Sequence, residues 1–150
     1  MSLGLYLHIP YCFSKCRYCD FYSHPGERGV QEAYVDALLR ELSRFAPEAP
    51  LQPDTLYFGG GTPSLLRPEQ AKRLIDAARP MPGAEITLEA NPETVTEESL
   101  AGFREAGVNR ISFGVQSARD TQLRTLGRPH TAKQARAAFA AARRAGFANI

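Results

Sequence analysis

The sequence has little net charge, few cysteines and no long apolar run. Its formal net charge of +2 over 150 residues is too small to indicate a nucleic-acid ligand or an anionic membrane surface. No apolar stretch approaches the ~20 residues that a membrane span needs, and the first residues show no basic segment followed by an apolar core. We therefore expect a cytoplasmic protein with no membrane span and no nucleic-acid partner.

The residues that are present have the composition of an ordinary globular domain. Hydrophobic residues make up 43% of the chain and charged residues 23%. A chain of 150 residues fits one domain, which can bury about two thirds of its unfolded surface.

All three cysteines, Cys12, Cys16 and Cys19, lie within eight residues, in the segment YCFSKCRYCDFY. The polar residues between and after them argue against a buried core segment, and a disulfide would leave one thiol over. Clustered free thiols are typical of a reducing compartment, where they stay available for a metal. The segment therefore predicts a metal site.

Two kinds of metal site fit this segment. The three cysteines could hold zinc together with His8 or His24, in a tetrahedral Cys₃His site. Structural zinc usually draws its ligands from two separated pairs, however, and there is no second CxxC here. The spacing C-x₃-C-x₂-C favours a cuboidal iron–sulfur cluster, because one tight loop can place three thiolates at three corners and leave the fourth iron without a protein ligand. We favour the cluster and keep zinc as the alternative.

Apolar runs and helical periodicity alternate along the whole chain. We expect strands at residues 3–9, 55–58, 85–90 and 110–115, with a fifth strand beginning at 148–150. We expect helices at residues 31–45, 68–80, 96–107, 120–126 and 131–146, the first of them ended by Pro47, Pro50 and Pro53. This alternation predicts an α/β fold with a parallel sheet, either open and doubly wound or part of a β/α barrel. The helix residues expected to be buried are Tyr34, Leu38, Leu42, Phe45, Ala71, Leu74, Ile75, Ala78, Leu100, Phe103, Ala135, Phe139 and Ala142.

Polar and glycine-rich residues follow the predicted strands. The cysteines follow the first strand, Gly59–Thr62 follows the second, Glu89 ends the third and Gln116 follows the fourth. Parallel α/β sheets bind their ligands at the carboxyl ends of the strands. We therefore expect these residues to meet at one edge of the sheet.

Several segments, in this order, together resemble one known family. They are YLHIPYC, CFSKCRYCDF, YFGGGTPS, EANPE, GVNRISFGVQS and LGRPH. Along the whole chain they resemble the radical S-adenosylmethionine (SAM) superfamily, and more narrowly the branch that contains the oxygen-independent coproporphyrinogen III dehydrogenases and the HemW-type haem chaperones. The resemblance implies that residues 1–150 are the amino-terminal portion of a partial β/α barrel. They would comprise about four βα units and the start of a fifth strand, an incomplete radical SAM core.

The resemblance also implies cofactors and the residues that bind them. In the family, three cysteines hold a [4Fe–4S] cluster, SAM chelates the remaining iron, and an electron from the reduced cluster splits SAM to give a 5′-deoxyadenosyl radical. Cys12, Cys16 and Cys19 are the cluster ligands implied here, with His8 hydrogen bonded nearby, while His24 and His130 are expected in solvent. The implied SAM contacts are Tyr6 at the end of the first strand, Tyr18, Gly60, Gly61, Thr62, Glu89, Gln116, and Arg128, which would pair with the SAM carboxylate.

Two departures from the family affect the predicted function. Phe21 stands where the dehydrogenases have a fourth cysteine, which favours the haem-chaperone branch. The family continues through further strands and a carboxyl-terminal domain, so we expect residues 1–150 to be a fragment of a longer protein. We predict a HemW-type protein that binds haem or a related porphyrin in its full-length form, receives electrons from a donor and passes haem to an acceptor protein. The alternatives are coproporphyrinogen III oxidation by a dehydrogenase and a zinc-stabilised α/β module.

Overall fold

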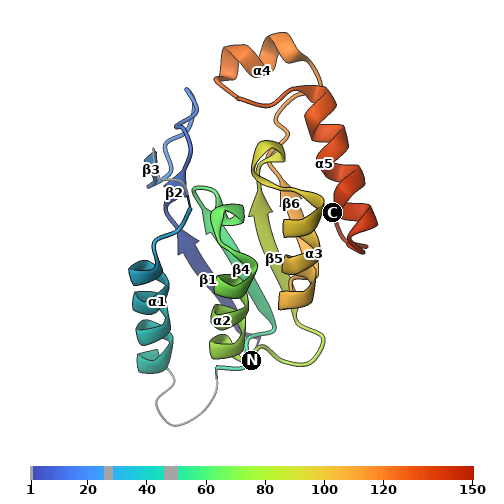
Figure 1. The fold of residues 1–150 in the computed structure, drawn as a ribbon. Coiled ribbons are helices and arrows are strands. Elements are labelled where there is room, and N and C mark those ends of the chain that lie inside the picture. Colours follow the sequence, from blue (N-terminus) through green and yellow to red (C-terminus); the bar gives the residue numbers. More distant parts are fainter. Residues whose placement is uncertain (1, 26–28, 46–50) are drawn as a thin grey trace.

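A four-stranded parallel sheet forms the centre of the computed structural model, which describes residues 2–25, 29–45 and 51–150. The strand order is β1-β4-β5-β6 (Figure 1). The strands are β1 (Gly4–Ile9), β4 (Thr55–Gly60), β5 (Glu85–Ala90) and β6 (Arg110–Phe113). A helix lies between each of these strands and the next along the chain. The predicted α/β fold with a parallel sheet is therefore confirmed.

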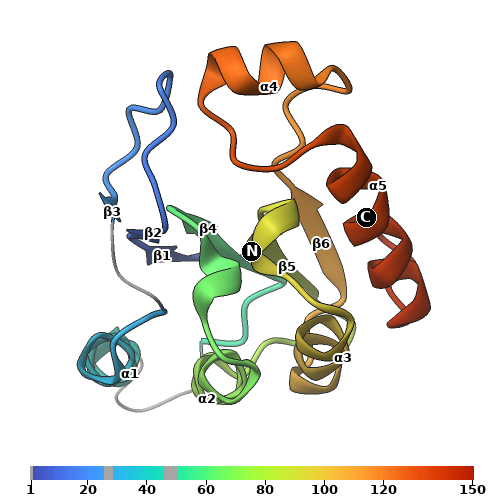
Figure 2. The ribbon, with the colours of Figure 1, turned by 45° about the horizontal axis from the view of Figure 1, so that its top comes forward.

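Three helices cover one face of this sheet. They are α1 (Glu32–Phe45), α2 (Pro68–Ala78) and α3 (Glu97–Ala106), which lie side by side in Figure 2. Helix α5 (Ala132–Arg144) packs against α3 beside β6, and α4 (Asp120–Leu126) lies beyond the carboxyl ends of the strands. Pro47 and Pro50, expected to end α1, lie outside the described residues. In the described parts of the chain, no helix is long and apolar enough to cross a bilayer.

The sheet is apolar toward these helices and polar on its other face. Leu56, Phe58 and Leu88 point toward the helices and are fully buried in the core. The intervening residues of the same strands point the other way, because side chains alternate along a strand. They form lateral rows in the strand register, of which one is Tyr6, Tyr57, Thr87 and Arg110, and another contains Glu89 and Ser112. The polar face therefore leads up to the edge where the cofactor site is expected.

The buried sides of the helices agree with the prediction for α2 and α3 and differ in part for α1 and α5. All the predicted residues of α2 and α3 are buried. The prediction for Phe45 is wrong: it is 75% exposed, because the buried stripe of α1 runs through Val35 and Leu42. The prediction for Phe139 is also wrong, at 44% exposed. Helix α5 packs instead through small side chains, which allow a close approach: Ala132, Ala135, Ala138 and Ala142.

Two strands end at other residues than predicted. Strand β4 continues to Gly60, so the glycine triplet begins inside the sheet. Strand β6 stops at Phe113, because the Val115 amide donates back to the Phe113 carbonyl (2.9 Å) and the Ser117 amide to the Val115 carbonyl (2.8 Å). The turn places Gln116 in a left-handed conformation, with φ of 65°.

The chain around the cysteines forms a small second sheet that the sequence did not predict. Strand β2 (Tyr11–Cys12) pairs in parallel with β3 (His24–Pro25). The start of the predicted fifth strand is present as one parallel bridge between Arg110 and Asn149. The β2–β3 pair fixes the base of the cysteine segment. The bridge to Asn149 extends the main sheet beyond β6.

Candidate cofactor site

A cavity of about 280 Å³ opens at the carboxyl ends of the strands. It lies between the cysteine loop, residues 13–23 between β2 and β3, and the ends of β4, β5 and β6. The predicted site residues that line it are Cys12, Cys16, Cys19, Tyr18, Gly60, Gly61, Thr62, Glu89, Gln116 and Arg128. Tyr6 is not among them. The expectation that these residues meet at one edge is confirmed by the structure, and their binding roles stay predictions.

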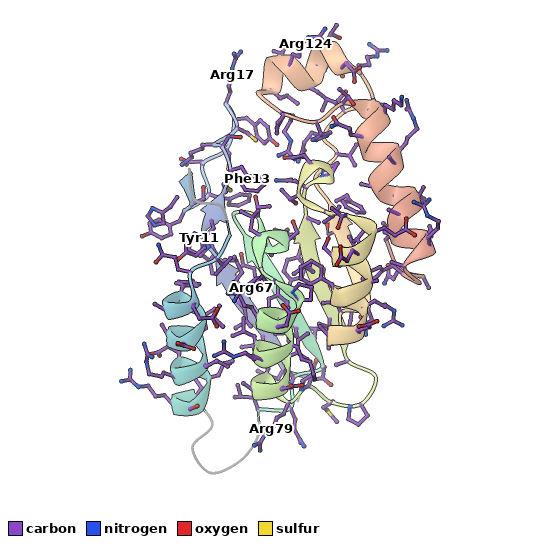
Figure 3. The ribbon with its side chains drawn as sticks, in the orientation of Figure 1. Tyr11, Phe13, Arg17, Arg67, Arg79 and Arg124 are labelled. Atoms are coloured by element: carbon purple, nitrogen blue, oxygen red, sulfur yellow. The ribbon has the colours of Figure 1, made fainter. Side chains whose placement is uncertain are left out.

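The cysteine loop is held at its base and at its tip. At the base, the His24 amide donates to the Pro10 carbonyl (2.6 Å), and His8 Nε2 donates to the Tyr22 carbonyl (2.9 Å). At the tip, the Arg17 amide donates to the Leu126 carbonyl (3.2 Å). Figure 3 shows Arg17 at this tip, close to the helix α4 that carries Arg124. The loop is thus held on both sides of the cavity. The His24 side chain is exposed, as expected.

The three thiols fit a cluster of several metal atoms. All three cysteines are free, and Cys12 is buried. Among the described residues, no three His, Cys, Asp or Glu side chains gather closely enough to hold one ion. A single tetrahedral zinc with bonds of about 2.3 Å would need its sulfurs about 3.8 Å apart, whereas a cuboidal cluster gives each thiolate an iron of its own. Three free cysteines can supply one thiolate to each of three irons, so the donor set fits a cluster.

Two of the thiols contact polar groups from other parts of the chain. Cys12 Sγ lies 3.3 Å from the Thr62 hydroxyl oxygen, and Arg128 Nη1 donates to Cys16 Sγ (3.3 Å). A hydroxyl group and a guanidinium group therefore lie beside two of the sulfur atoms that are predicted to bind the cluster.

The glycine triplet is needed where β4 meets the start of the cysteine segment. The Gly61 amide donates to the Ile9 carbonyl (2.8 Å), and a Cβ at Gly61 would lie only 2.6 Å from the Tyr11 carbonyl oxygen. Gly60 has a left-handed φ of 117° and lies against His8. These glycines allow the two backbones to approach, which is a structural requirement whether or not they also contact SAM.

Glu89 is oriented by a tyrosine that the sequence analysis did not single out. The Tyr57 hydroxyl donates to Glu89 Oε1 (2.7 Å). Burial is the larger cause and this hydrogen bond the next, and together they raise the pKa of Tyr57 to about 12. The phenol therefore stays protonated and acts as the donor. One carboxylate oxygen of Glu89 is thereby fixed on the side of Tyr57, and Glu89 still lines the cavity.

Tyr6 lies away from the position predicted for it. It is in the middle of β1, 54% exposed, and stacks on Tyr57 with ring centroids 6.0 Å apart. The prediction placed it at the end of the strand, but β1 continues for three residues to Ile9.

Tyr18, in contrast, lines the cavity as predicted. Burial raises the pKa of Tyr18, and the positive charge of Arg128 opposes that shift.

Arg128 is buried at the centre of the site. It is 8% exposed, and its Nη2 donates to Asn91 Oδ1 (2.5 Å) and to the Gly114 carbonyl (2.8 Å). Asn91 was not among the residues predicted for the site. Its position inside the EANPE segment, two residues after Glu89, was the signal that could have identified it.

His130 is buried, so the expectation that it lies in solvent is wrong. It is 2% exposed; its Nε2 donates to the Val115 carbonyl (3.1 Å), and its Nδ1 lies 3.1 Å from the Glu93 carboxylate. The ring therefore ties the segment that carries Arg128 to the end of β6. A polar loop sequence did not reveal this, because the partners of His130 come from two other segments of the chain.

These features define a parallel α/β protein with three free thiols beside a cavity at the carboxyl edge of its sheet. Over residues 6–150 the sequence matches the Radical SAM superfamily, and the chain belongs to that superfamily. The family implies a [4Fe–4S] cluster and SAM as cofactors.

The relatives of this chain belong to the predicted branch. The chain is 44% identical over 142 residues to the heme chaperone HemW of Escherichia coli, covering 91% of this chain and 38% of that protein. It is 40% identical over 152 residues to the heme chaperone HemW of Bacillus subtilis, covering 97% and 40%. The structure of coproporphyrinogen III oxidase (HemN) from Escherichia coli superposes with a TM-score of 0.83 at 30% identity, covering 98% of this chain and 35% of that one. The chain thus spans about two fifths of the length of these relatives.

Proposed function

We propose that this chain forms the cluster-binding and SAM-binding part of a HemW-type haem chaperone. The observation that carries the proposal is the cavity that brings together the three cysteines, the glycine triplet, Glu89, Gln116 and Arg128. The 44% identity to a protein named heme chaperone HemW supports the haem-handling function. An electron donor for the cluster, a haem-accepting protein and a cytosolic location are part of the proposal, the last because clustered free thiols suit a reducing compartment.

Different residues of the cavity would bind the cluster and SAM. Cys12, Cys16 and Cys19 would each bind one iron, and the remaining iron would be open to the amino and carboxylate groups of SAM. When bound, the cluster supplies the electron that cleaves the C–S bond of SAM. Gln116 would hydrogen bond to the ribose and Tyr18 would stack near the adenine. The glycine triplet would let the backbone approach the methionine end of SAM.

Phe21 favours the chaperone over the oxidative decarboxylation of coproporphyrinogen III. Its side chain lines the cavity and is 67% exposed. The resemblance implies a fourth cysteine at this position in the dehydrogenases, and a phenyl ring has neither a hydrogen-bond donor nor a redox-active atom to take its place. The dehydrogenase remains the second candidate because of the structural similarity to coproporphyrinogen III oxidase at 30% identity.

Anaerobic incubation of the full-length protein with SAM, a reductant and coproporphyrinogen III separates the two candidates. We expect no protoporphyrinogen, measured as protoporphyrin fluorescence after oxidation, and we expect the same preparation to retain haem, seen as a Soret band after gel filtration. Escherichia coli coproporphyrinogen III oxidase serves as the positive control for product formation. Protoporphyrinogen formed by this protein at a comparable rate would contradict the chaperone proposal.

A further inference from the structure

A continuous chain of polar contacts joins two of the three cysteine thiols. Cys12 Sγ lies 3.3 Å from the Thr62 hydroxyl oxygen. The Asn91 amide nitrogen donates to the same oxygen (3.2 Å), and Asn91 Oδ1 accepts a hydrogen bond from Arg128 Nη2 (2.5 Å). Arg128 Nη1 in turn donates to Cys16 Sγ (3.3 Å). Asn91 therefore stands at the middle of a path that begins and ends at a thiol.

With iron-bound thiolates at Cys12 and Cys16, the chemistry of these groups fixes the direction of each hydrogen bond. Arg128 has only N–H donors, so the Asn91 atom that faces it is the carbonyl oxygen, and the Asn91 NH₂ group faces Thr62. The Thr62 oxygen accepts from Asn91. A Cys12 thiolate bound to iron has no hydrogen to donate, so the Thr62 hydroxyl is then the donor to Cys12. Cys12 and Cys16 therefore each receive one hydrogen bond, and both bonds depend on the orientation of the Asn91 amide.

Burial strengthens these contacts. Thr62 is 2% exposed, and Arg128 and Cys12 are each 8% exposed. In such surroundings water competes little for the hydrogen-bonding groups, and a charge is weakly screened. Arg128 Nε is buried with no hydrogen-bond partner in the described part of the chain, so the two Nη groups alone hold the guanidinium in hydrogen bonds. Asn91 accepts from one of these groups.

We propose that Asn91 is a positioning residue that orients Thr62 and Arg128 as donors to the Cys12 and Cys16 thiolates, and that these two hydrogen bonds raise the reduction potential of the cluster. The inference rests on the proposed function, in which these cysteines hold a [4Fe–4S] cluster. A reduced cluster carries one more negative charge than an oxidised one, so donors at its thiolates stabilise the reduced form more. Asn91 acts through its neighbours, because neither of its side-chain contacts is to a thiol.

Redox titration of the reconstituted full-length protein without SAM, followed by electron paramagnetic resonance (EPR), tests this inference. Thr62→Val keeps the shape of the side chain and removes the donor to Cys12. We expect the ratio of reduced to oxidised cluster at a fixed solution potential to fall about fivefold, in line with one lost hydrogen bond. Asn91→Ala removes the contacts that orient Thr62 and Arg128. We expect the ratio of reduced to oxidised cluster to fall about tenfold in this variant, which for a one-electron couple is a shift of about 59 mV to more negative potential.

Thr87→Val is the matched control for Thr62→Val. Thr87 is 1% exposed and its hydroxyl accepts a hydrogen bond from Arg110 Nη1 (3.2 Å), yet it contacts no thiol among the described residues. We expect the wild-type ratio in this variant.

Asn91→Ala should keep the local turn, because backbone groups of Asn91 hold it. The Thr94 amide donates to the Asn91 carbonyl (3.0 Å), and the Asn91 amide donates to the Thr94 hydroxyl oxygen (3.3 Å).

The outcomes distinguish this inference from the proposed function. Wild-type ratios in Thr62→Val and Asn91→Ala, with normal iron content, would overturn the inference and leave the proposed function intact. If Thr62→Val takes up no cluster, the ratio in Asn91→Ala decides. If the wild-type protein takes up no iron and sulfide, the proposed function fails and the inference fails with it.

Discussion

Replacing Cys12 with alanine is expected to abolish cluster assembly and to leave the fold in place. Cys12 is the buried member of the three thiols, and its loss would leave the cluster with two protein ligands in place of three. Alanine fits the buried position without a clash, because it is smaller than cysteine. After anaerobic reconstitution of the full-length protein, we expect about four iron atoms per wild-type chain and nearly none in Cys12→Ala.

Ser14→Ala is the control for this variant. Ser14 belongs to the same loop and lines the same cavity, but it carries no thiol. We expect it to retain the wild-type iron and sulfide content, with both variants showing the wild-type far-ultraviolet circular dichroism spectrum. A full complement of iron in Cys12→Ala would show that Cys12 is not a cluster ligand.

Replacing Gly61 with alanine is expected to cost about 1–3 kcal/mol of unfolding free energy, the usual range for overpacking at a tight position. The added methyl group would meet backbone atoms, the Tyr11 carbonyl oxygen at 2.6 Å and the Ile9 carbonyl oxygen at 3.0 Å, and neither can rotate away. Because both atoms belong to the segment that leads into the cysteine loop, we also expect reduced cluster uptake. Chemical denaturation and iron analysis measure the two effects.

Gly83→Ala separates the clash from the general effect of adding a methyl group. A Cβ at Gly83 would have no heavy atom within 4 Å beyond its chain neighbours, although the φ of 84° is left-handed. We expect a loss of about 1 kcal/mol from backbone strain and no change in iron uptake. Equal behaviour of the two variants would show that the close approach at Gly61 does not position the loop.

The sequence was sufficient to predict the strands of the main sheet, the helices, and the edge of the sheet where the site lies. The burial of Leu74 and Phe103 followed from helical periodicity, and the parallel strands followed from the alternation of elements. In a parallel sheet, residues after different strands must meet at one edge, so the grouping of Glu89 with the cysteine loop could be derived without coordinates. The motif spacing supplied the chemistry.

Other features depend on contacts that no local pattern encodes. The pairing of β2 with β3 involves two residues in each strand, too few for a period to be recognised. His130 is buried because Glu93 and the Val115 carbonyl reach it from other segments. The EANPE segment could have marked Asn91 as a site residue, but its two partners, Thr62 and Arg128, come from other segments and are known only from the fold. In each case the tertiary arrangement, and not the neighbouring sequence, determines the environment of the residue.

The most direct test of a cluster with an iron open to SAM is EPR of the reduced, reconstituted full-length protein with and without SAM. Coordination of SAM to one iron changes the ligand field of the cluster, so we expect the g values to shift on addition of SAM. Addition of the same volume of buffer without SAM controls for dilution. A spectrum that SAM leaves unchanged, or a preparation that binds zinc with no iron or sulfide, would contradict the assignment.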